Sequence, residues 1–201
     1  MPTHRRPVHR RPTQRRHWIF DLDGTLTVAV HDFDDLRRRL GLPLGAPILE
    51  TIETRPAEER SDLLARVAAW EQALIDQATV APGALKLLDF LADRGHHLGI
   101  LTRNLKGIAL ATLQRVGLAD RFPPDLVVGR EEAPAKPEPG GVHCLLQRWQ
   151  ADPSDAVMVG DYLYDLQAGR RAGVFTVHVG SAPGWPEWTD RRVEGLEELT
   201  S

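Results

Sequence analysis

Two acidic residues separated by one position, Asp21 and Asp23, directly follow a short β-prone run at residues 17–20. A carboxylate can attack phosphorus and form an aspartyl-phosphate, which divides one difficult displacement into two easier ones. A second carboxylate two residues later could protonate the leaving oxygen and then activate water, if the backbone turns just past the strand. Gly24 would permit that turn. The spacing therefore fits phosphoryl transfer, although Asp-Gly-Thr can also be an ordinary turn.

Further side chains suited to phosphate chemistry follow later apolar runs. They are Thr102 and Arg103 after residues 97–101, Lys136 in a short loop after residues 126–129, and Asp161 and Asp165 after residues 156–160. Crowded carboxylates repel one another unless a divalent cation lies among them, and Mg²⁺ prefers oxygen ligands. A transferring phosphoryl group also needs fixed positive partners such as a lysine. These residues predict one magnesium-dependent site, provided that the fold brings them together.

The apolar runs alternate with amphipathic segments, which predicts an α/β fold. Strands are expected at residues 17–20, 97–101, 126–129, 156–160 and 176–180, and helices at residues 84–94, 105–116, 142–150 and 163–172. Such alternation is typical of right-handed crossovers that build a parallel sheet with helices on both faces. Because the carboxyl ends of parallel strands frame the ligand crevice, the polar residues should meet there.

A long interval after the first strand breaks this alternation. Its apolar spacing predicts only helices, at residues 32–40, 47–54 and 56–78. We therefore expect a small all-helical cap, called here the helical insert (residues 28–81), within a core domain of residues 17–27 and 82–201. The end of the core, after Gly180, is expected to form a capping turn and a short helix.

Composition and charge exclude several classes of protein. The chain has 201 residues, 42% hydrophobic and 26% charged, and no apolar run approaches the ~20 residues that span a bilayer. Residues 1–16 carry six arginines and no acid, and we expect a disordered tail there. The rest carries 19 basic and 28 acidic residues, a net charge of −9, which disfavours a general nucleic-acid surface. A single cysteine, Cys144, excludes an internal disulfide framework, so a cytoplasmic location is expected.

The polar motifs, in this order, resemble those of the haloacid dehalogenase superfamily, which has a Rossmann-like core. The matched residues are Asp21, Asp23 and Thr25 for the first motif, Thr102 for the second, Lys136-Pro137 for the third, and Asp161 with Asp165 for the fourth. The resemblance runs from about residue 17 to residue 180 and is strongest to the subgroup of phosphoglycolate phosphatase and beta-phosphoglucomutase. It implies that the helical insert is the family's cap in its usual place.

This resemblance implies a role for each matched residue. Asp21 would be the nucleophile and Asp23 the general acid and base. Thr102 and Lys136 would hold the phosphoryl oxygens. Arg103 lies outside the matched motifs and could either bind a substrate phosphate or carboxylate, or pair with an acid on the core surface. The residues implied for Mg²⁺ are Asp21, Asp23 through its backbone carbonyl, and Asp161, supported by Thr25 and Asp165.

Three alternatives to a phosphatase stay open at this point. A phosphomutase of the same superfamily would use the same residues but must shield its aspartyl-phosphate from water, which a small cap does poorly. A receiver-like signalling domain carries its phosphoacceptor after the third strand, whereas no acid closes that strand here, at Val128-Gly129. An inactive binding protein is disfavoured because every catalytic position is filled. We therefore expect a phosphatase for a small phosphorylated metabolite such as phosphoglycolate or a sugar phosphate, with no nucleic-acid or membrane partner.

Substrate choice is expected to depend on the helical insert. Candidate contacts there are Arg37, Arg38 and Arg55, with His31 near the hinge, although each of them also fits an exposed surface position. The oligomeric state is left open.

Overall fold

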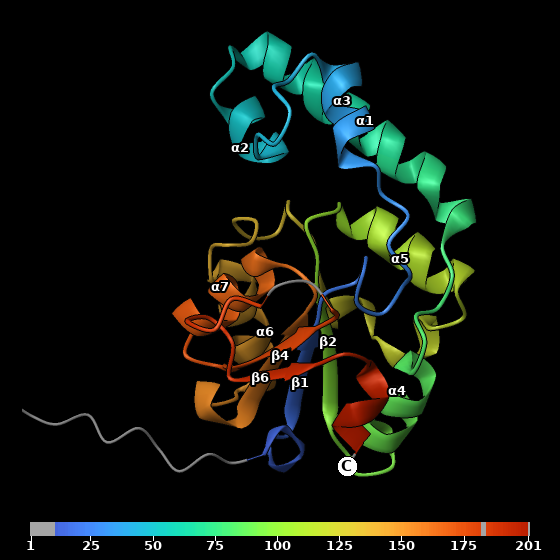
Figure 1. Cartoon of the computed structure of the whole chain (residues 1–201), viewed down its shortest axis with the longest axis vertical. Coiled ribbons are helices and arrows are strands. Elements are labelled where there is room, and N and C mark those ends of the chain that lie inside the picture. The colour runs from blue at the N-terminus through green and yellow to red at the C-terminus, as the bar shows by residue number, and fades with distance from the viewer. Residues whose placement is uncertain (1–10, 182–183, 201) are drawn as a thin grey trace, which may run out of the picture.

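Six parallel strands form one sheet at the centre of the molecule (Figure 1). The structure is a computed structural model and describes residues 11–181 and 184–200. In spatial order the strands are β3 (Val127–Val128), β2 (His97–Leu101), β1 (His17–Phe20), β4 (Ala156–Gly160), β5 (Phe175–Val179) and β6 (Arg191–Val193). The predicted α/β fold with a parallel sheet is therefore confirmed.

The strand that leads to Asp21 lies inside this sheet. All four side chains of β1 are buried, as expected for a strand covered by helices on both faces. Trp18 and Phe20 join the apolar cluster on one face, and Ile19 joins the cluster on the other. The strand pairs with β2 and β4, and the Asp21 N–H continues the ladder by donating to the Val159 carbonyl at 2.9 Å. Hydrogen bonds of the sheet therefore fix the position of the Asp21 backbone.

Helices cover both faces of the sheet (Figure 1). They are α4 (Ala84–Ala92) and α5 (Lys106–Arg115) on one face, and α6 (Gly140–Trp149) and α7 (Leu163–Arg171) on the other. Leu87, Leu88 and Leu91 of α4 are fully buried in the first cluster. Each contributes roughly 1.5–3 kcal/mol through burial. The two clusters are the core that holds the strand ends in place.

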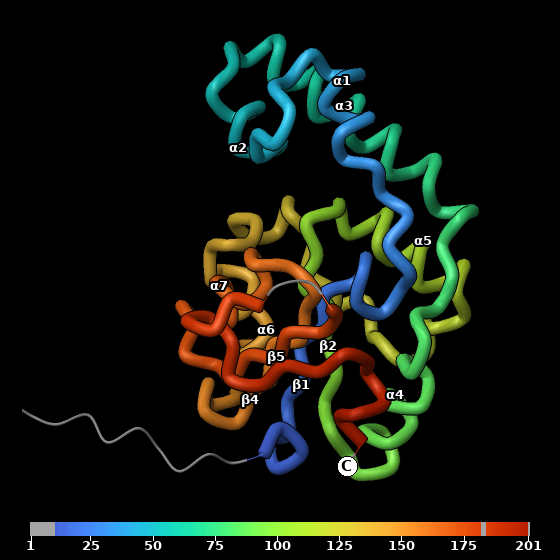
Figure 2. The backbone as a smooth tube through the Cα atoms, in the orientation of Figure 1, coloured from blue at the N-terminus to red at the C-terminus, as the bar shows by residue number. Residues whose placement is uncertain are grey.

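The helical insert forms a separate layer beyond the carboxyl ends of the strands (Figures 1 and 2). It consists of α1 (Phe33–Leu40), α2 (Ile48–Glu53) and α3 (Ala57–Leu74), followed by a 3₁₀ turn at Ile75–Gln77. α1 begins where the Asp32 side chain accepts a hydrogen bond from the Asp35 N–H at 2.9 Å, and it ends at Gly41, whose φ of 66° is left-handed. The insert has an apolar cluster of its own, formed by Leu36, Leu40, Leu42, Ile48, Ile52, Leu63 and Val67.

Two chain segments connect the insert to the core. They pair where Val28 N–H donates to the Thr79 carbonyl and Ala81 N–H donates to the Leu26 carbonyl, both at 2.9 Å. An isolated antiparallel bridge between Thr27 and Val80 lies between these bonds. Both connections therefore leave the core together, beside the turn that carries Asp23.

The C-terminal segment contains a strand that the sequence analysis did not predict. β6 adds to β5 at the edge of the sheet and is followed by a 3₁₀ helix at Leu196–Thr200 that packs against α4. Only three residues form β6, and the first two are Arg191 and Arg192. So short and charged a run shows no hydrophobic alternation, although charge is common on edge strands.

The expected tail of residues 1–16 is described only from residue 11. Pro12–Gln14 form a 3₁₀ turn, and the Arg15 guanidinium lies 4.7 Å from the centre of the Phe175 ring and donates to the Ser154 carbonyl. Residues 11–16 therefore pack against the core, where disorder was expected. Residues 1–10 lie outside the described residues. Within the described ranges, no helix has both the length and the apolar character needed to cross a bilayer.

The close approach of α7 to the end of β4 generates a prediction about stability. A Cβ on Gly160 would lie 2.2 Å from the Cβ of Asp165, so the start of α7 would have to move. We expect Gly160→Ala to lower the free energy of unfolding by about 1–3 kcal/mol, the usual cost of overpacking. Urea denaturation measures this change.

Gly107→Ala is the matched control. Gly107 is exposed in α5, and a Cβ there would meet no atom within 4 Å. The control should be neutral or stabilise the protein by up to about 1 kcal/mol, because alanine favours helices. Equal stability of the two variants would contradict the packing described for Gly160.

Candidate active site

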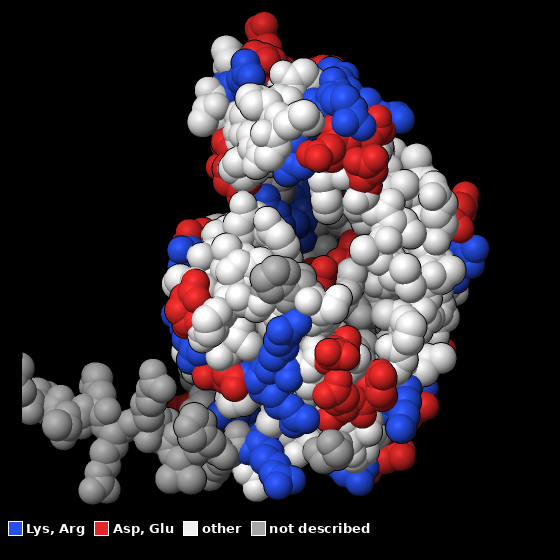
Figure 3. Space-filling model, in the orientation of Figure 1, with Lys and Arg blue, Asp and Glu red and all other residues white. Residues whose placement is uncertain are grey.

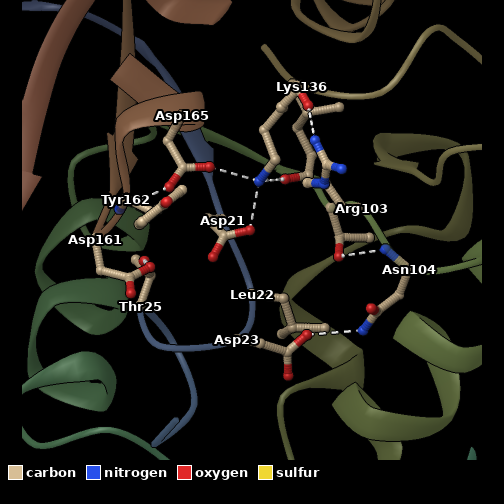
Figure 4. A network of polar contacts seen from close by, with 12 residues as sticks. Asp21, Leu22, Asp23, Thr25, Arg103, Asn104, Lys136, Asp161, Tyr162 and Asp165 are labelled. Atoms are coloured by element: carbon tan, nitrogen blue, oxygen red, sulfur yellow. Dashed lines mark hydrogen bonds and ion pairs between the residues drawn. The ribbon is translucent and has the colours of Figure 1, made fainter. Parts of the chain in front are cut away.

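Predicted site residues from four separate segments meet at the carboxyl edge of the sheet (Figure 4). Asp21 follows β1, Thr102 follows β2 and Asp161 follows β4, while Lys136 reaches in from the loop after β3. All four line one cavity. They meet because neighbouring parallel strands end at the same edge, however far apart they lie in the sequence.

Lys136 is buried, and its ammonium group joins two of the acids. Nζ donates to Asp21 Oδ1 at 2.5 Å and to the Leu101 carbonyl at 2.7 Å, and it lies 2.6 Å from Asp165 Oδ1. Burial alone would lower the pKa of Lys136, but the carboxylates of Asp165 and Asp21 outweigh it and raise that pKa. A buried ammonium is tolerated only with such partners. Lys136 therefore supplies a fixed positive charge beside Asp21.

Three carboxylates at this edge form a group suited to a cation. Oxygens of Asp21, Asp161 and Asp165 lie within 4.8 Å of one another. Burial raises the pKa of Asp21 well above its ordinary value, although Lys136 opposes the rise. Burial also raises the pKa of Asp161 to about 6, and repulsion from Asp165 adds to this. Lys136 alone therefore does not balance the negative charge of the three carboxylates. Their oxygen-only donor set fits a hard divalent cation.

Thr25 and Gly24 position Asp161. The Thr25 hydroxyl donates to Asp161 Oδ1 at 3.1 Å. Gly24 has a left-handed φ of 93°, and a Cβ there would lie only 2.5 Å from Asp161 Oδ2. The turn after Asp23 thus passes directly beneath Asp161. Glycine suits this position because it adopts a left-handed φ and has no Cβ to clash with the Asp161 carboxylate.

Asp23 lines the same cavity but lies apart from the Lys136 contacts. Asn104 Nδ2 donates to Asp23 Oδ2 at 2.7 Å, and the Thr27 hydroxyl donates to Oδ1 at 3.3 Å. The N–H of Asn104 also donates to the hydroxyl of Thr102 at 3.1 Å. Asn104 therefore links the loop after β2 to the turn after β1. The sequence analysis did not predict this role, because an asparagine near a helix start is most simply explained as part of a cap.

Arg103 contacts the helical insert, which differs from the predicted role in binding a substrate phosphate. Its two terminal nitrogens donate to the carboxylate of Glu50 in α2 at 2.9 and 3.0 Å, and one of them also donates to the Lys136 carbonyl. The guanidinium lies 4.8 Å from the centre of the Tyr164 ring. Pairing with an acid was the alternative prediction, but the acid belongs to the insert and not to the core surface.

A second ion pair between the insert and the core is more deeply buried. Arg130 donates to both oxygens of Glu71 in α3, at 2.7 and 2.9 Å, and each side chain is 8% exposed. The same nitrogen of Arg130 donates to the Arg103 carbonyl at 2.8 Å. Burial raises the pKa of Glu71 to about 7, although Arg130 opposes the rise. Glu50 therefore binds an arginine of the loop after Thr102, and Glu71 binds the arginine that holds the same loop through the Arg103 carbonyl.

The cavity between the insert and the sheet edge has a volume of about 400 Å³. Figure 3 shows a hollow at this level of the molecule, with acidic and basic side chains inside it. Two of the predicted substrate contacts, His31 and Arg37, line the cavity, whereas Arg38 and Arg55 do not. Its inner end, at the sheet edge, is formed by the buried residues Asp21, Thr102 and Lys136.

Residues 16–173 match the model of a hydrolase family described as haloacid dehalogenase-like hydrolase. The chain therefore belongs to the haloacid dehalogenase-like hydrolase family, as the motifs predicted.

Individual relatives agree with this assignment. The chain is 34% identical over 170 residues to a haloacid dehalogenase-like hydrolase domain-containing protein of Arabidopsis thaliana, covering 79% of this chain and 68% of the relative. It is 36% identical over 186 residues to a phosphoglycolate phosphatase of Rhodospirillum rubrum, covering 78% and 76%. Among solved structures, a hydrolase from Pseudomonas syringae has the same fold, with a TM-score of 0.76 and 22% identity over 92% of this chain and 96% of that chain.

The buried Glu71 carboxyl generates a prediction about pH. Its pKa of about 7 in the folded protein lies above the ordinary 4.5, so folding favours the protonated form. The stability that this group contributes is thus present in full below about pH 4.5 and is lost as the pH rises through 7. Glu71→Gln removes the titration while keeping the shape. Its free energy of unfolding relative to wild type should therefore increase between pH 5 and 7, by up to about 3 kcal/mol.

Denaturant unfolding at a series of pH values, without added metal, measures this difference. Glu53→Gln, which changes an exposed glutamate of α2 in the same insert, serves as the control and should show no such trend. A Glu71→Gln difference that stays flat with pH would contradict the prediction.

Proposed function

We propose that this protein is a magnesium-dependent phosphatase that hydrolyses a small phosphate monoester through an aspartyl-phosphate on Asp21. The observation that supports this most directly is the position of Lys136 Nζ, which lies 2.5 Å from Asp21 and 2.6 Å from Asp165 beside the third acid, Asp161. A candidate nucleophile, the fixed positive charge of Lys136 and a group of candidate oxygen ligands thus lie at one end of the cavity. Membership of the hydrolase family supports the same conclusion and disfavours a receiver-like signalling domain.

In the first step, an oxygen of Asp21 would attack phosphorus while the bond between phosphorus and the leaving oxygen breaks. Asp23 would give its proton to the leaving oxygen, so that a neutral alcohol departs. Lys136 and Thr102 would bind the phosphoryl oxygens and stabilise their charge. Asn104, which donates to Asp23, would keep that carboxyl pointing to the leaving-group side.

In the second step, water would attack the phosphorus of the aspartyl-phosphate. Asp23, now ionised, would take a proton from the water, and the bond between Asp21 and phosphorus would break to release inorganic phosphate. Both carboxyls then return to their initial protonation states. The same residue can serve as acid and base because the two transfers occur at the same place in the cavity.

The residues that would hold Mg²⁺ are Asp21, Asp161 and the backbone carbonyl of Asp23, with Asp165 nearby. Their fit to a cation is supported by the raised pKa values of Asp21 and Asp161, since like charges in a buried group favour protonation unless positive charge is added. When bound, Mg²⁺ would neutralise charge on the phosphoryl oxygens and favour ionised Asp21.

We further propose that the helical insert acts as a cap over this site. Its contacts with the core through Glu50 and Glu71 support that role. A phosphomutase remains the main alternative, because it would use the same residues. Hydrolysis is favoured because relatives of this chain, among them the Rhodospirillum rubrum protein, are named as phosphatases.

The mechanism predicts that Asp21→Asn abolishes Mg²⁺-dependent hydrolysis of p-nitrophenyl phosphate. An amide cannot serve as the nucleophile, so kcat should fall by at least about three orders of magnitude. Chelation of metal should remove wild-type activity, and added Mg²⁺ should restore it. Release of p-nitrophenolate followed by absorbance measures both effects.

Asp120→Asn is the control. It alters an exposed acid that does not line the cavity, so this variant should keep full activity. Activity that survives in Asp21→Asn would remove that residue from its proposed role.

A further inference from the structure

We propose that the substrate's leaving group is uncharged and presents a flat apolar ring, as in an arylmethyl phosphate, and not a carboxylate. This inference rests on the proposed function, because it names the substrate class of the same site. It comes from the outer half of the cavity, where the leaving group would lie.

The charged residues at the insert end of the cavity are already paired. Arg103 gives both terminal nitrogens to Glu50, and Glu71 receives two hydrogen bonds from Arg130. Arg37 also lines the cavity, but it donates to the Ala46 carbonyl and to Asp34, each at 2.8 Å. A carboxylate on the leaving group would therefore have to compete for these cations. Enclosing a carboxylate without a partner is costly.

Aromatic rings stand on the insert side of this space. The Phe33 ring is 50% exposed, although it is large and apolar, and it lines the cavity. It stacks on His31, with ring centres 5.5 Å apart and planes at 14°, and lies 5.8 Å from the Trp70 ring. These neighbours hold Phe33 in place while leaving part of its surface open. An exposed ring held in this way at a cavity is suited to ligand contact.

A second aromatic group stands on the core side. Tyr162 is 53% exposed and lines the cavity at the start of α7. Its ring lies 5.1 Å from that of Tyr164, at 87°, and 5.7 Å from that of Trp185. Tyr162 is next to Asp161, so this group begins directly beside the proposed metal ligands. Rings on both the insert and the core therefore line the path outward from the phosphoryl position.

Aliphatic side chains of the insert also line the cavity. They are Leu36, Ile48, Leu49 and Val67. A volume of about 400 Å³ also exceeds what a two-carbon leaving group would fill. A ring would bury apolar surface against these side chains and could stack on the aromatic groups, whereas glycolate or a sugar would leave its polar groups poorly matched.

Three substrates with similar leaving-group chemistry test this inference. Benzyl phosphate, glycerol 3-phosphate and phosphoglycolate all release a primary alcohol, so differences in kcat/KM report mainly on the pocket. With Mg²⁺, we expect kcat/KM for benzyl phosphate to exceed both others by at least about tenfold. Phe33→Ala and Tyr162→Ala should each lower kcat/KM for benzyl phosphate by about 3- to 10-fold, with less than about twofold change for glycerol 3-phosphate.

Leu85→Ala is the matched control, since Leu85 is 48% exposed on α4 and does not line the cavity. It should change none of the three values. A preference for phosphoglycolate, or an equal loss on all three substrates in the two aromatic variants, would overturn the inference while leaving a phosphatase in place.

Binding separates failure of this inference from failure of the proposed function. Calorimetric titration of the Asp21→Asn protein with Mg²⁺ should give a Kd for benzyl phosphate at least about tenfold lower than for phosphoglycolate. If the wild-type protein hydrolysed none of the substrates but still bound benzyl phosphate more tightly, the proposed reaction would be wrong. The proposed preference of the cavity for an apolar ring would then still be supported. Equal affinities for benzyl phosphate and phosphoglycolate, or tighter binding of phosphoglycolate, would refute the preference for an apolar ring.

Discussion

The buried ammonium of Lys136 is the interaction on which the arrangement of this site depends. A lysine that is 2% exposed must be surrounded by acceptors, and here they are two carboxylates and the Leu101 carbonyl. Because Asp21 and Asp165 come from different ends of the chain, the sheet must bring β1 and β4 together before the charge can be accommodated. Removal of one member of such a group typically costs about 3–5 kcal/mol, because the others are left buried and unpaired. The same contacts thus contribute to folding and, in the proposed reaction, to the chemistry as well.

The loop after β2 connects this centre with the helical insert. Thr102 lines the inner end of the cavity, Arg103 binds Glu50, and Asn104 binds Asp23. Arg130 supports the loop from outside through the Arg103 carbonyl and binds Glu71 as well. Three consecutive residues therefore contact the proposed phosphate end of the cavity, the insert and the proposed general acid, Asp23. A shift of the helical insert would therefore be transmitted to the turn that carries Asp23 through two contacts, Glu50 with Arg103 and Asn104 with Asp23.

Much of the fold and the centre of the site could be predicted from the sequence, for a physical reason. Polar residues that follow buried strands of a parallel sheet must meet at one edge, so Asp21, Thr102 and Asp161 converge whatever the details of the loops. Glu50 and Glu71 could not be found in this way. Glu50 is one of two acids in α2 and Glu71 is one of four in α3, and acids on a helix usually lie on its solvated face. Their arginine partners lie 53 and 59 residues away. β6 escaped prediction because it is too short to show a period.

The two ion pairs also bear on how far the insert can be exchanged between relatives. Glu50 and Glu71 belong to different helices, α2 and α3, and their partners belong to different core loops. A chimera that received a foreign insert without acids at both positions would leave Arg130 with a buried, uncompensated charge and Arg103 with a half-buried one. Recombination at the paired connections near Thr27 and Val80 is therefore expected to succeed only when the donor insert brings both carboxylates with it.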